Sequence, residues 1–277
     1  MTPLLMVVVV LVGGMLAGII GALTGLGGGL VIVPLLTLGL HLPLPEAVGV
    51  SLWGVIATST GAAPRFVGTG LSNVRLALVL QVAASSGALI GALVAHNVPA
   101  RILFLIFGLV MLYSAVMSFL PGHHDDAGAP TDSPLATKLR LGSRYKSGDG
   151  WVDYKVQGVA PAFGVMVGAG MLSAMLGIGS GVFKVLAMDK LMHLPFRVST
   201  ATSNFMIGIT AATSAGFYLS RGEVPPLIAA PMILGVLWGA YLGGHWMTVL
   251  PVQKLRRIFA VVLCFVAVDM LLKGLGV

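Results

Sequence analysis

The sequence predicts an all-α polytopic membrane protein of about ten transmembrane segments, arranged as two inverted five-segment repeats with glycine-rich helix breaks. Three observations support this fold class. First, 57% of the 277 residues are hydrophobic and only 9% are charged, whereas soluble domains carry about 25% charged residues. Second, long stretches such as 2–40 and 157–183 contain no charged side chain, as expected for segments in lipid. Third, an unusual glycine-rich run occurs twice.

Apolar runs bounded by charged residues or by Pro and Gly define ten candidate segments. They lie at roughly 3–23, 28–40, 46–64, 74–95, 100–120, 156–176, 180–192, 199–219, 224–247 and 254–275. A helix needs about 20 apolar residues to span a bilayer. The second and seventh segments are shorter, so we expect each to cross at an angle or only in part. The first lacks the basic start of a signal peptide, and we expect it to remain as a helix.

The polar stretch 121–155 divides the chain into a first transmembrane repeat, 1–120, and a second, 156–277. It holds five aspartates and five basic residues together with Gly and Pro, a composition typical of a flexible extramembrane linker. His123 and His124 precede two of the aspartates and suit a metal ion, but a solvated loop is the simpler interpretation. No metal and no cofactor are expected.

The two repeats are related by one fixed offset of 152 positions, the separation of Gly25 and Gly177. At this offset the run Gly25–Gly29 matches Gly177–Gly181, and His41-Leu42-Pro43 matches the three residues from His193. Further matches are Ser51 with Ser203, Thr58 with Thr210, Gly87 with Gly239, and Pro99 with Pro251. Shared hydrophobicity does not explain matches of Gly, Pro, His and Ser over about 90 positions. Internal duplication is typical of transporter folds.

Basic residues predict how the chain is oriented. If all ten segments cross, twelve basic residues lie on the side of the linker and three on the other. If the two short segments are re-entrant, the division is nine against six. The positive-inside rule therefore favours ten crossings in the cell (inner) membrane, with the 121–155 linker in the cytoplasm and both termini outside. The same rule accounts for the net charge of +7 without a nucleic-acid partner.

The glycine runs and a small-polar motif after them resemble one known family. Gly25–Pro34 has the form Gly-x-Gly-Gly-Gly with a following proline, and Gly177–Leu186 is a degenerate copy. The small-polar motif is 47–52 in the first repeat and 199–204 in the second. Over nearly the whole chain apart from the linker, the sequence resembles the TauE/SafE sulfite exporter family. The resemblance implies a multi-pass carrier for small sulfur-containing anions in a bacterial cytoplasmic membrane.

The sequence departs from the family pattern in the first repeat. The usual Thr-Ser pair is Val50-Ser51 in the first copy and Thr202-Ser203 in the second. The second copy also replaces Gly28 with Ser180 and Pro34 with Leu186. The polar residues are therefore concentrated in the second copy.

Glycine-rich breaks inside a membrane suit an anion, because their free backbone amides and positive helix ends approach it closely. Tight helix packing explains glycines equally well in a single copy; their recurrence favours binding. Together with the hydroxyl and amide side chains that follow, they define the candidate substrate-binding residues: Gly27, Gly28, Gly29, Ser51, Gly179, Ser180, Gly181, Lys184, Thr202, Ser203 and Asn204. For Thr58 and Thr210 we expect only local bonds to the preceding helical turn.

Lys184 and two aspartates are the notable charges within the segments. Lys184 stands where the first repeat has Ile32, and an ionisable residue inside a membrane is a functional hypothesis. It would neutralise an anion, unless its side chain only extends to the interface. Asp189 and Asp269 are weaker candidates for coupling to protons. His41 and His193 have titratable rings, but their position before Leu-Pro favours a role in ending a helix.

The sequence therefore predicts a secondary transporter and not an enzyme. It would move a small sulfur-containing anion of the sulfite, sulfonate or sulfoacetate class by alternating access between the repeats, in the export direction. Its partners would be that anion, the lipid bilayer and, as a coupling ion, the proton. One alternative is a membrane-embedded hydrolase at Ser180, for which the sequence assigns no base. Another is a carrier for a different small anion or a cation, although clustered carboxylates are missing from the apolar segments.

Overall fold

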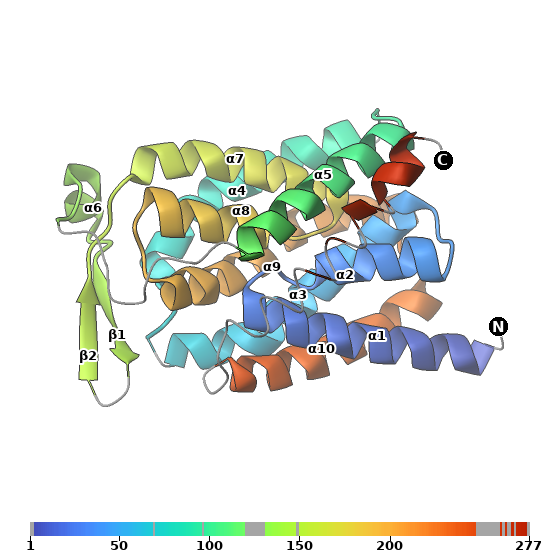
Figure 1. Ribbon diagram of the computed structural model, residues 1–277, viewed down its shortest axis with the longest axis horizontal. Helices are drawn as coiled ribbons and strands as arrows, with labels where there is room; N and C mark the ends of the chain where they lie inside the picture. Colours follow the sequence, from blue (N-terminus) through green and yellow to red (C-terminus); the bar gives the residue numbers. More distant parts are fainter. Residues whose placement is uncertain are drawn as a thin grey trace.

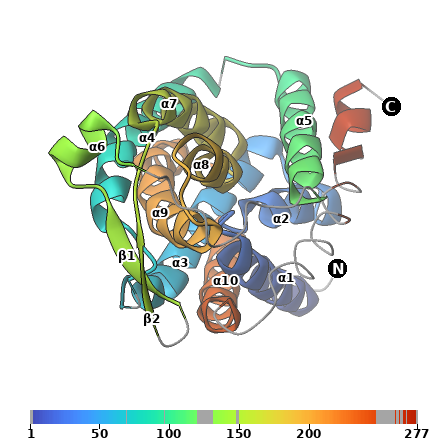
Figure 2. The same cartoon turned by 60° about the vertical axis from the view of Figure 1, so that its left-hand side comes forward.

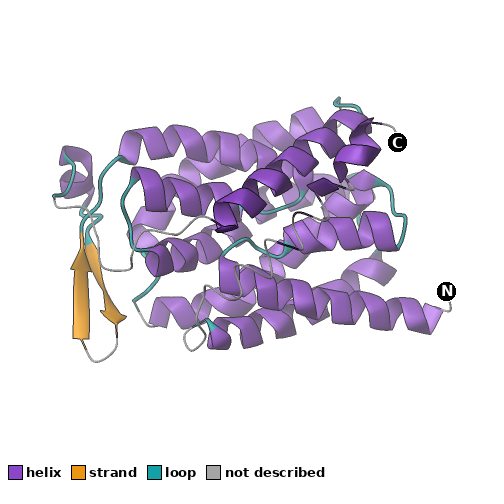
Figure 3. Ribbon diagram, in the orientation of Figure 1, coloured by secondary structure: helices purple, strands orange, loops and turns teal. Residues whose placement is uncertain are grey.

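A computed structural model describes residues 3–68, 70–95, 97–119, 131–147 and 150–247, together with 261, 264, 267, 268 and 270–275. Helices dominate the described residues, and two strands pair at one end of the molecule (Figure 3). In the first repeat the helices are α1 (Pro3–Thr24), α2 (Gly29–Pro34), a π-helical turn η1 (Leu35–Gly39), α3 (Leu44–Gly68), α4 (Val74–Ala95) and α5 (Ala100–Phe119). The predicted short second segment is thus α2 continued by η1.

In the predicted second repeat, the described elements follow the same order. It consists of α7 (Val159–Leu176), α8 (Gly181–Leu186), η2 (Ala187–Leu191), α9 (Phe196–Ser220) and α10 (Pro226–Trp246). The tenth predicted segment, 254–275, lies largely outside the described residues, of which 270–275 are helical. Of the described helices, α1, α4, α7 and α10 are long and apolar enough to cross a membrane, and Gly29–Gly39 is a shorter apolar helix. The apolar part of the chain is therefore all-α, as expected for a membrane protein.

A small ordered unit, the cap, occupies part of the predicted linker. It comprises α6 (Pro134–Leu139) and a hairpin of β1 (Ser143–Ser147) with β2 (Gly150–Tyr154), paired antiparallel with Ser143 opposite Tyr154. Ser133 caps α6 by accepting from the Ala136 amide at 3.2 Å. The prediction of a flexible linker is therefore wrong for residues 131–147 and 150–155. The alternating pattern of Tyr145, Val152 and Tyr154 around a Gly-rich turn explains why a hairpin forms there.

The helices run along the long axis of the molecule, and the cap lies at one end (Figure 1). Both chain termini lie near the opposite end, in this view and after a 60° turn (Figure 2). α1 starts at the end with the termini, and α2 runs back towards that end from the interior (Figure 1). The glycine run between α1 and α2 thus reverses the chain inside the molecule.

Glycine contacts fix the relative directions of the packed helices. A Cβ at Gly14 would contact Met232, and one at Gly18 would contact Val236, so α1 and α10 run parallel. α4 and α7 show the same pattern at Gly87 with Val167 and at Gly91 with Met171.

By contrast, α3 and α9 run antiparallel. Gly49 near the start of α3 approaches Glu223, just after α9, whereas Ser59 further along α3 donates to the carbonyl of Phe205 near the start of α9. These two helices occupy equivalent places in the two repeats. The direction of the chain is therefore reversed between them.

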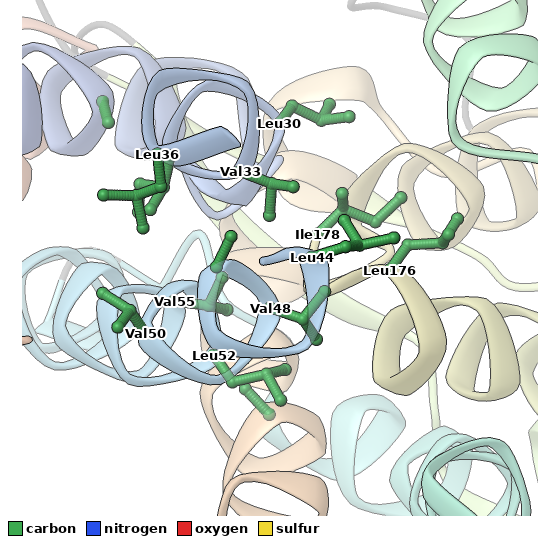
Figure 4. Close-up of a cluster of buried hydrophobic side chains, with 14 of the residues drawn as sticks. Leu30, Val33, Leu36, Leu44, Val48, Val50, Leu52, Val55, Leu176 and Ile178 are labelled. Atoms are coloured by element: carbon green, nitrogen blue, oxygen red, sulfur yellow. The ribbon is translucent and has the colours of Figure 1, made fainter. Parts of the chain in front are cut away.

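Buried apolar side chains join the two halves around α3. Leu30 and Val33 of α2 face Val48 and Val55 of α3, with Ile178 close by (Figure 4). All five are at most 1% exposed. This core holds the two glycine runs against each other, because Ile178 belongs to the second run and α2 directly follows the first.

Candidate functional site

The two glycine runs form two helix breaks with the same backbone path. The first break lies between α1 and α2, and the second between α7 and α8. Three residues in each break adopt left-handed conformations, which glycine reaches without steric cost. They are Gly25, Gly27 and Gly28 at φ of 73°, 84° and 73°, and Gly177, Gly179 and Ser180 at 68°, 71° and 49°.

The breaks contact each other in the interior of the molecule. A Cβ at Gly29 would collide with the carbonyl oxygen of Gly177, and a Cβ at Gly181 would collide with that of Gly25. Side chains of Val55 and Ile207 lie against both Gly27 and Gly179. Gly29 and Gly181 are therefore needed for the packing of one break on the other.

Two serines of the small-polar motifs satisfy carbonyls of the opposite break. Ser51 Oγ donates to the Gly177 oxygen at 2.6 Å, and Ser203 Oγ donates to the Gly25 oxygen at 2.9 Å. Thr58 Oγ1 donates to the Gly27 oxygen at 3.1 Å. Because a buried carbonyl without a donor is costly, each half supplies what the other half's break needs.

Thr202 and Asn204 bind elsewhere along the chain. Thr202 Oγ1 accepts from the backbone amide of Asn73 at 3.0 Å, in the turn between α3 and α4. Asn204 Nδ2 donates to the Ala22 carbonyl at 3.0 Å, in the last turn of α1. Of these two predicted residues, Asn204 lies next to a break and Thr202 links α9 to the turn before α4.

Several buried hydroxyls near the breaks have no hydrogen-bond partner among the described residues. They belong to Ser180, Ser199 and Thr200. Ser180 occupies the N-cap position of α8 within the second break without a side-chain capping bond, and Thr200 packs against Gly25 of the first. Buried polar groups are normally satisfied by protein, water or ligand. No described side chain hydrogen-bonds to Ser180 as a general base would, so the geometry does not favour the hydrolase alternative.

Lys184 of α8 is completely buried. Its ammonium donates to Thr210 Oγ1 of α9 at 2.6 Å. With its oxygen turned towards Thr210, the side-chain amide of Gln81 on α4 accepts from the Thr210 hydroxyl at 3.0 Å and from Ser85 Oγ at 2.7 Å, and its nitrogen donates to the Met206 carbonyl. Lys184, Thr210, Gln81 and Ser85 together form a polar cluster that joins three helices.

The polar cluster exists in one half of the molecule only. At an offset of 152 positions, Ile32 stands in place of Lys184 and Ile233 in place of Gln81. The sequence indicated Lys184, but it missed Gln81, and Thr210 was expected to bond only within its helix. The sequence feature that could have indicated Gln81 is its amide side chain, which lies within a mainly apolar segment.

Asn73 connects the cap to the small-polar motif of the second repeat. Its Nδ2 donates to the Leu141 carbonyl at 2.8 Å and to Tyr154 Oη at 3.0 Å, and its Oδ1 accepts from the amide of Leu76 at the start of α4. The adjacent Ser72 donates to the Ala201 carbonyl at 2.9 Å. Sequence reasoning missed this residue because its partners lie in the cap, which was predicted to be flexible.

Asp189, His41 and His193 lie in or just beyond the π-helical turns η1 and η2, not within the glycine-rich breaks. Asp189 in η2 is buried, with its Oδ2 3.6 Å from the Lys190 ammonium, and Asp269 is outside the described residues. His41 and His193 both adopt left-handed conformations, at φ of 53° and 54°, just beyond η1 and η2. Within the described ranges, no three side chains of His, Cys, Asp or Glu gather as a metal site would require.

Multiple apolar spans, paired helix breaks in the interior and a buried lysine define a class: polytopic membrane proteins whose polar groups lie inside a helical bundle, as in transporters. The profile of the family described as "Sulfite exporter TauE/SafE" matches residues 10–270. The chain belongs to this family. The resemblance noted in the sequence is thereby confirmed.

Curated relatives support the same class over nearly the full length. The "Probable membrane transporter protein YunE" of Bacillus subtilis is 26% identical, covering 97% of this chain and 98% of the relative. YdhB of the same organism, also named a probable membrane transporter protein, is 27% identical over 91% and 94% of the two chains. A probable membrane transporter protein of Haemophilus influenzae is 27% identical over 94% and 96%. No solved structure matches the chain.

Proposed function

We propose that the protein is a secondary transporter for a small sulfur-containing anion of the sulfite, sulfonate or sulfoacetate class. It works by alternating access and exports the anion across the cytoplasmic membrane. The family supports the transporter class and this type of cargo. The observation that carries the proposal for this chain is the complete burial of the Lys184 amino group beside a neutral hydroxyl.

A buried lysine needs a counter-charge or must lose its proton. Lys184 Nζ has three donors, and its one hydrogen bond within the described structure is to the neutral hydroxyl of Thr210. The ion pair of Lys190 with Asp189 lies in η2, beyond the end of α8, and does not include Lys184. An anion entering the bundle would supply the missing charge and accept from the remaining donors.

The unpaired hydroxyls provide further donors for such an anion. Ser180 lies one residue before the start of α8, and Lys184 lies within that helix. Thr200 lies against the first break. We propose that the anion binds beside the breaks at the predicted glycines together with Ser180, Lys184 and Asn204. Ser51, Ser203 and Thr202 support the site by holding the breaks and α9 in place.

We also propose the ten-span architecture with two inverted five-segment repeats, 1–120 and 156–277, on either side of the 121–155 linker. Three observations support it: the matched left-handed residues, the exchanged serine-to-carbonyl bonds, and the antiparallel course of α3 and α9. With the linker in the cytoplasm, both termini lie outside. Alternating access would then be a rocking of one half against the other around the breaks.

The proposal predicts that anion flux depends on Lys184. In proteoliposomes, Lys184→Met should lower sulfite or sulfonate uptake at least about tenfold, which corresponds to about 1.4 kcal/mol of lost interaction. Lys138→Met is the matched control, because this lysine is exposed on α6 of the cap, away from the proposed site. Absence of saturable flux for every sulfur anion tested, or equal loss in the two variants, would contradict the proposal.

Proton coupling is the second part of the proposal. Asp189 is its candidate within the described residues, because its carboxylate is buried and Oδ1 has no hydrogen-bond partner there; Asp269 is the other candidate. Flux should increase when a pH gradient is imposed, and Asp189→Asn should abolish that increase while flux without a gradient persists. A gradient response that survives in both Asp189→Asn and Asp269→Asn would exclude both aspartates.

A further inference from the structure

A groove lies between α3 and α10. Its volume is about 580 Å³, within the range of about 300–1,000 Å³ that is typical of ligand sites. α3 contributes Gly61, Pro64 and Arg65, and α10 contributes Trp238 and Tyr241. The transport proposal uses none of these residues.

The groove is hollow because small and large side chains face each other across it. Gly61 and Pro64 project little from α3, whereas the rings of Trp238 and Tyr241 stand out from α10 and are 65% and 59% exposed. α10 is one of the helices suited to cross a membrane. Such exposed rings therefore face lipid, and the space between them and α3 is open to an acyl chain.

The position of the groove across the membrane follows from the direction of its two helices. α3 and α10 run parallel, since Gly54 approaches Val236 and Gly244 approaches Ala62. α3 ends at Gly68, and Gly70 lies against Trp151 of the cap. Arg65 is three residues before the end of α3, or about 4.5 Å along the helix axis. Arg65 thus lies at the membrane boundary on the cap side, and Gly61 lies deeper.

We propose that this groove binds an anionic phospholipid. The guanidinium of Arg65 contacts the phosphate, for which its planar donors are well suited. One acyl chain lies along Gly61 and Pro64, against Trp238 and Tyr241. Basic pockets between transmembrane helices on the cytoplasmic side bind anionic headgroups.

A lipid fits the groove better than a second copy of the chain. A symmetric dimer would bring the same patch of both subunits together and would place two Arg65 side chains in one apolar interface. The equivalent positions in the other half are Phe217, Ser86 and Leu89 in place of Arg65, Trp238 and Tyr241. The combination of a guanidinium with two rings is therefore specific to this face.

Native mass spectrometry of the full-length protein tests the proposal with phosphatidylglycerol and phosphatidylcholine as probes. Wild type should retain phosphatidylglycerol in preference, and Arg65→Gln should weaken its binding about fivefold. Trp238→Ala should weaken binding of both lipids. Arg75→Gln and Leu234→Ala are the matched controls: Arg75 is an exposed arginine in the first turn of α4, and Leu234 is an exposed residue of α10 outside the groove. Neither should change binding.

A second measurement compares the tryptophan fluorescence of the wild-type chain with that of one variant. Phosphatidylglycerol brominated on its acyl chains should quench tryptophan fluorescence in nanodiscs, and Trp238→Phe should remove most of that quenching. Equal loss of binding in Arg75→Gln and Arg65→Gln would overturn the proposal, because it would show attraction to surface charge alone. Equal retention of the two lipids by wild type, or a dimer that dissociates in Trp238→Ala, would overturn it as well.

Discussion

Ser51 and Ser203 each stabilise the opposite helix break through one hydrogen bond. Each hydroxyl donates to a backbone carbonyl of that break. Removing either hydroxyl leaves a fully buried carbonyl without that donor. We expect Ser51→Ala and Ser203→Ala each to lower the free energy of unfolding by about 1–3 kcal/mol. Thermal unfolding in detergent measures the loss.

Ser86 provides the control for these two substitutions. Its hydroxyl donates to the Val82 carbonyl of its own helix at an exposed position. Ser86→Ala should change stability by no more than about 0.5 kcal/mol. If all three variants unfolded at the same temperature, the exchanged bonds would not contribute to stability as described.

At the scale of elements, the two breaks approach each other closely at glycines, because a side-chain methyl group at these positions would collide with the opposite break. Gly29→Ala and Gly181→Ala force a Cβ into the backbone of the opposite break, and we expect each to cost about 1–3 kcal/mol. Gly216→Ala in α9 is the control, because a Cβ there meets nothing within 4 Å. There alanine should be neutral or stabilise the helix by up to about 1 kcal/mol. Chemical denaturation in detergent would separate these outcomes, and tolerance of alanine at both break positions would contradict the packing.

The cap should detach at high pH. Burial raises the pKa of Tyr154 to about 12, although its hydrogen bond with Asn73 acts in the opposite direction. The neutral phenol is thus favoured in the folded cap. Its contribution to stability is complete below pH 10 and is lost as the pH rises through about 12.

Proteolysis measures this loss of the cap. Trypsin should cleave after Arg140 and Arg144 faster at pH 10.5 than at pH 8, after correction for its own activity. In Tyr154→Phe the residual pH dependence should be much smaller. If the ratio of the cleavage rates at pH 10.5 and pH 8 were the same in wild type and in Tyr154→Phe, another group would control the stability of the cap.

The sequence predicted the elements better than their contacts. Apolar runs located the described helices to within a few residues, and the repeat predicted that 28–40 and 180–192 would be short. The cap was missed because its polar composition outweighed the strand pattern around Tyr145 and Tyr154. Gln81 and Asn73 were missed for a different reason: their importance depends on partners about 70–130 positions away, which no local pattern shows.

At the scale of the whole molecule, the proposed topology predicts which residues are accessible from each side of the membrane. Cys264 is the one cysteine of the chain, so a Cys264→Ser background allows single cysteines to be placed elsewhere. Leu4→Cys near the N-terminus should react with an impermeant thiol reagent added outside intact cells. Thr137→Cys in the cap should react only after the membrane is opened. Reaction of both from the same side would contradict the inverted arrangement.

The exchanged bonds between the breaks also have a consequence for how the protein is made. The carbonyl of Gly25 receives its hydroxyl donor from Ser203, 178 positions later in the chain. During synthesis the first half therefore enters the membrane with its helix break incomplete, and it is completed only after α9 has been inserted. The polar groups of the first break must meanwhile be satisfied by water or by the insertion machinery. The order of synthesis thus constrains the glycine run between α1 and α2.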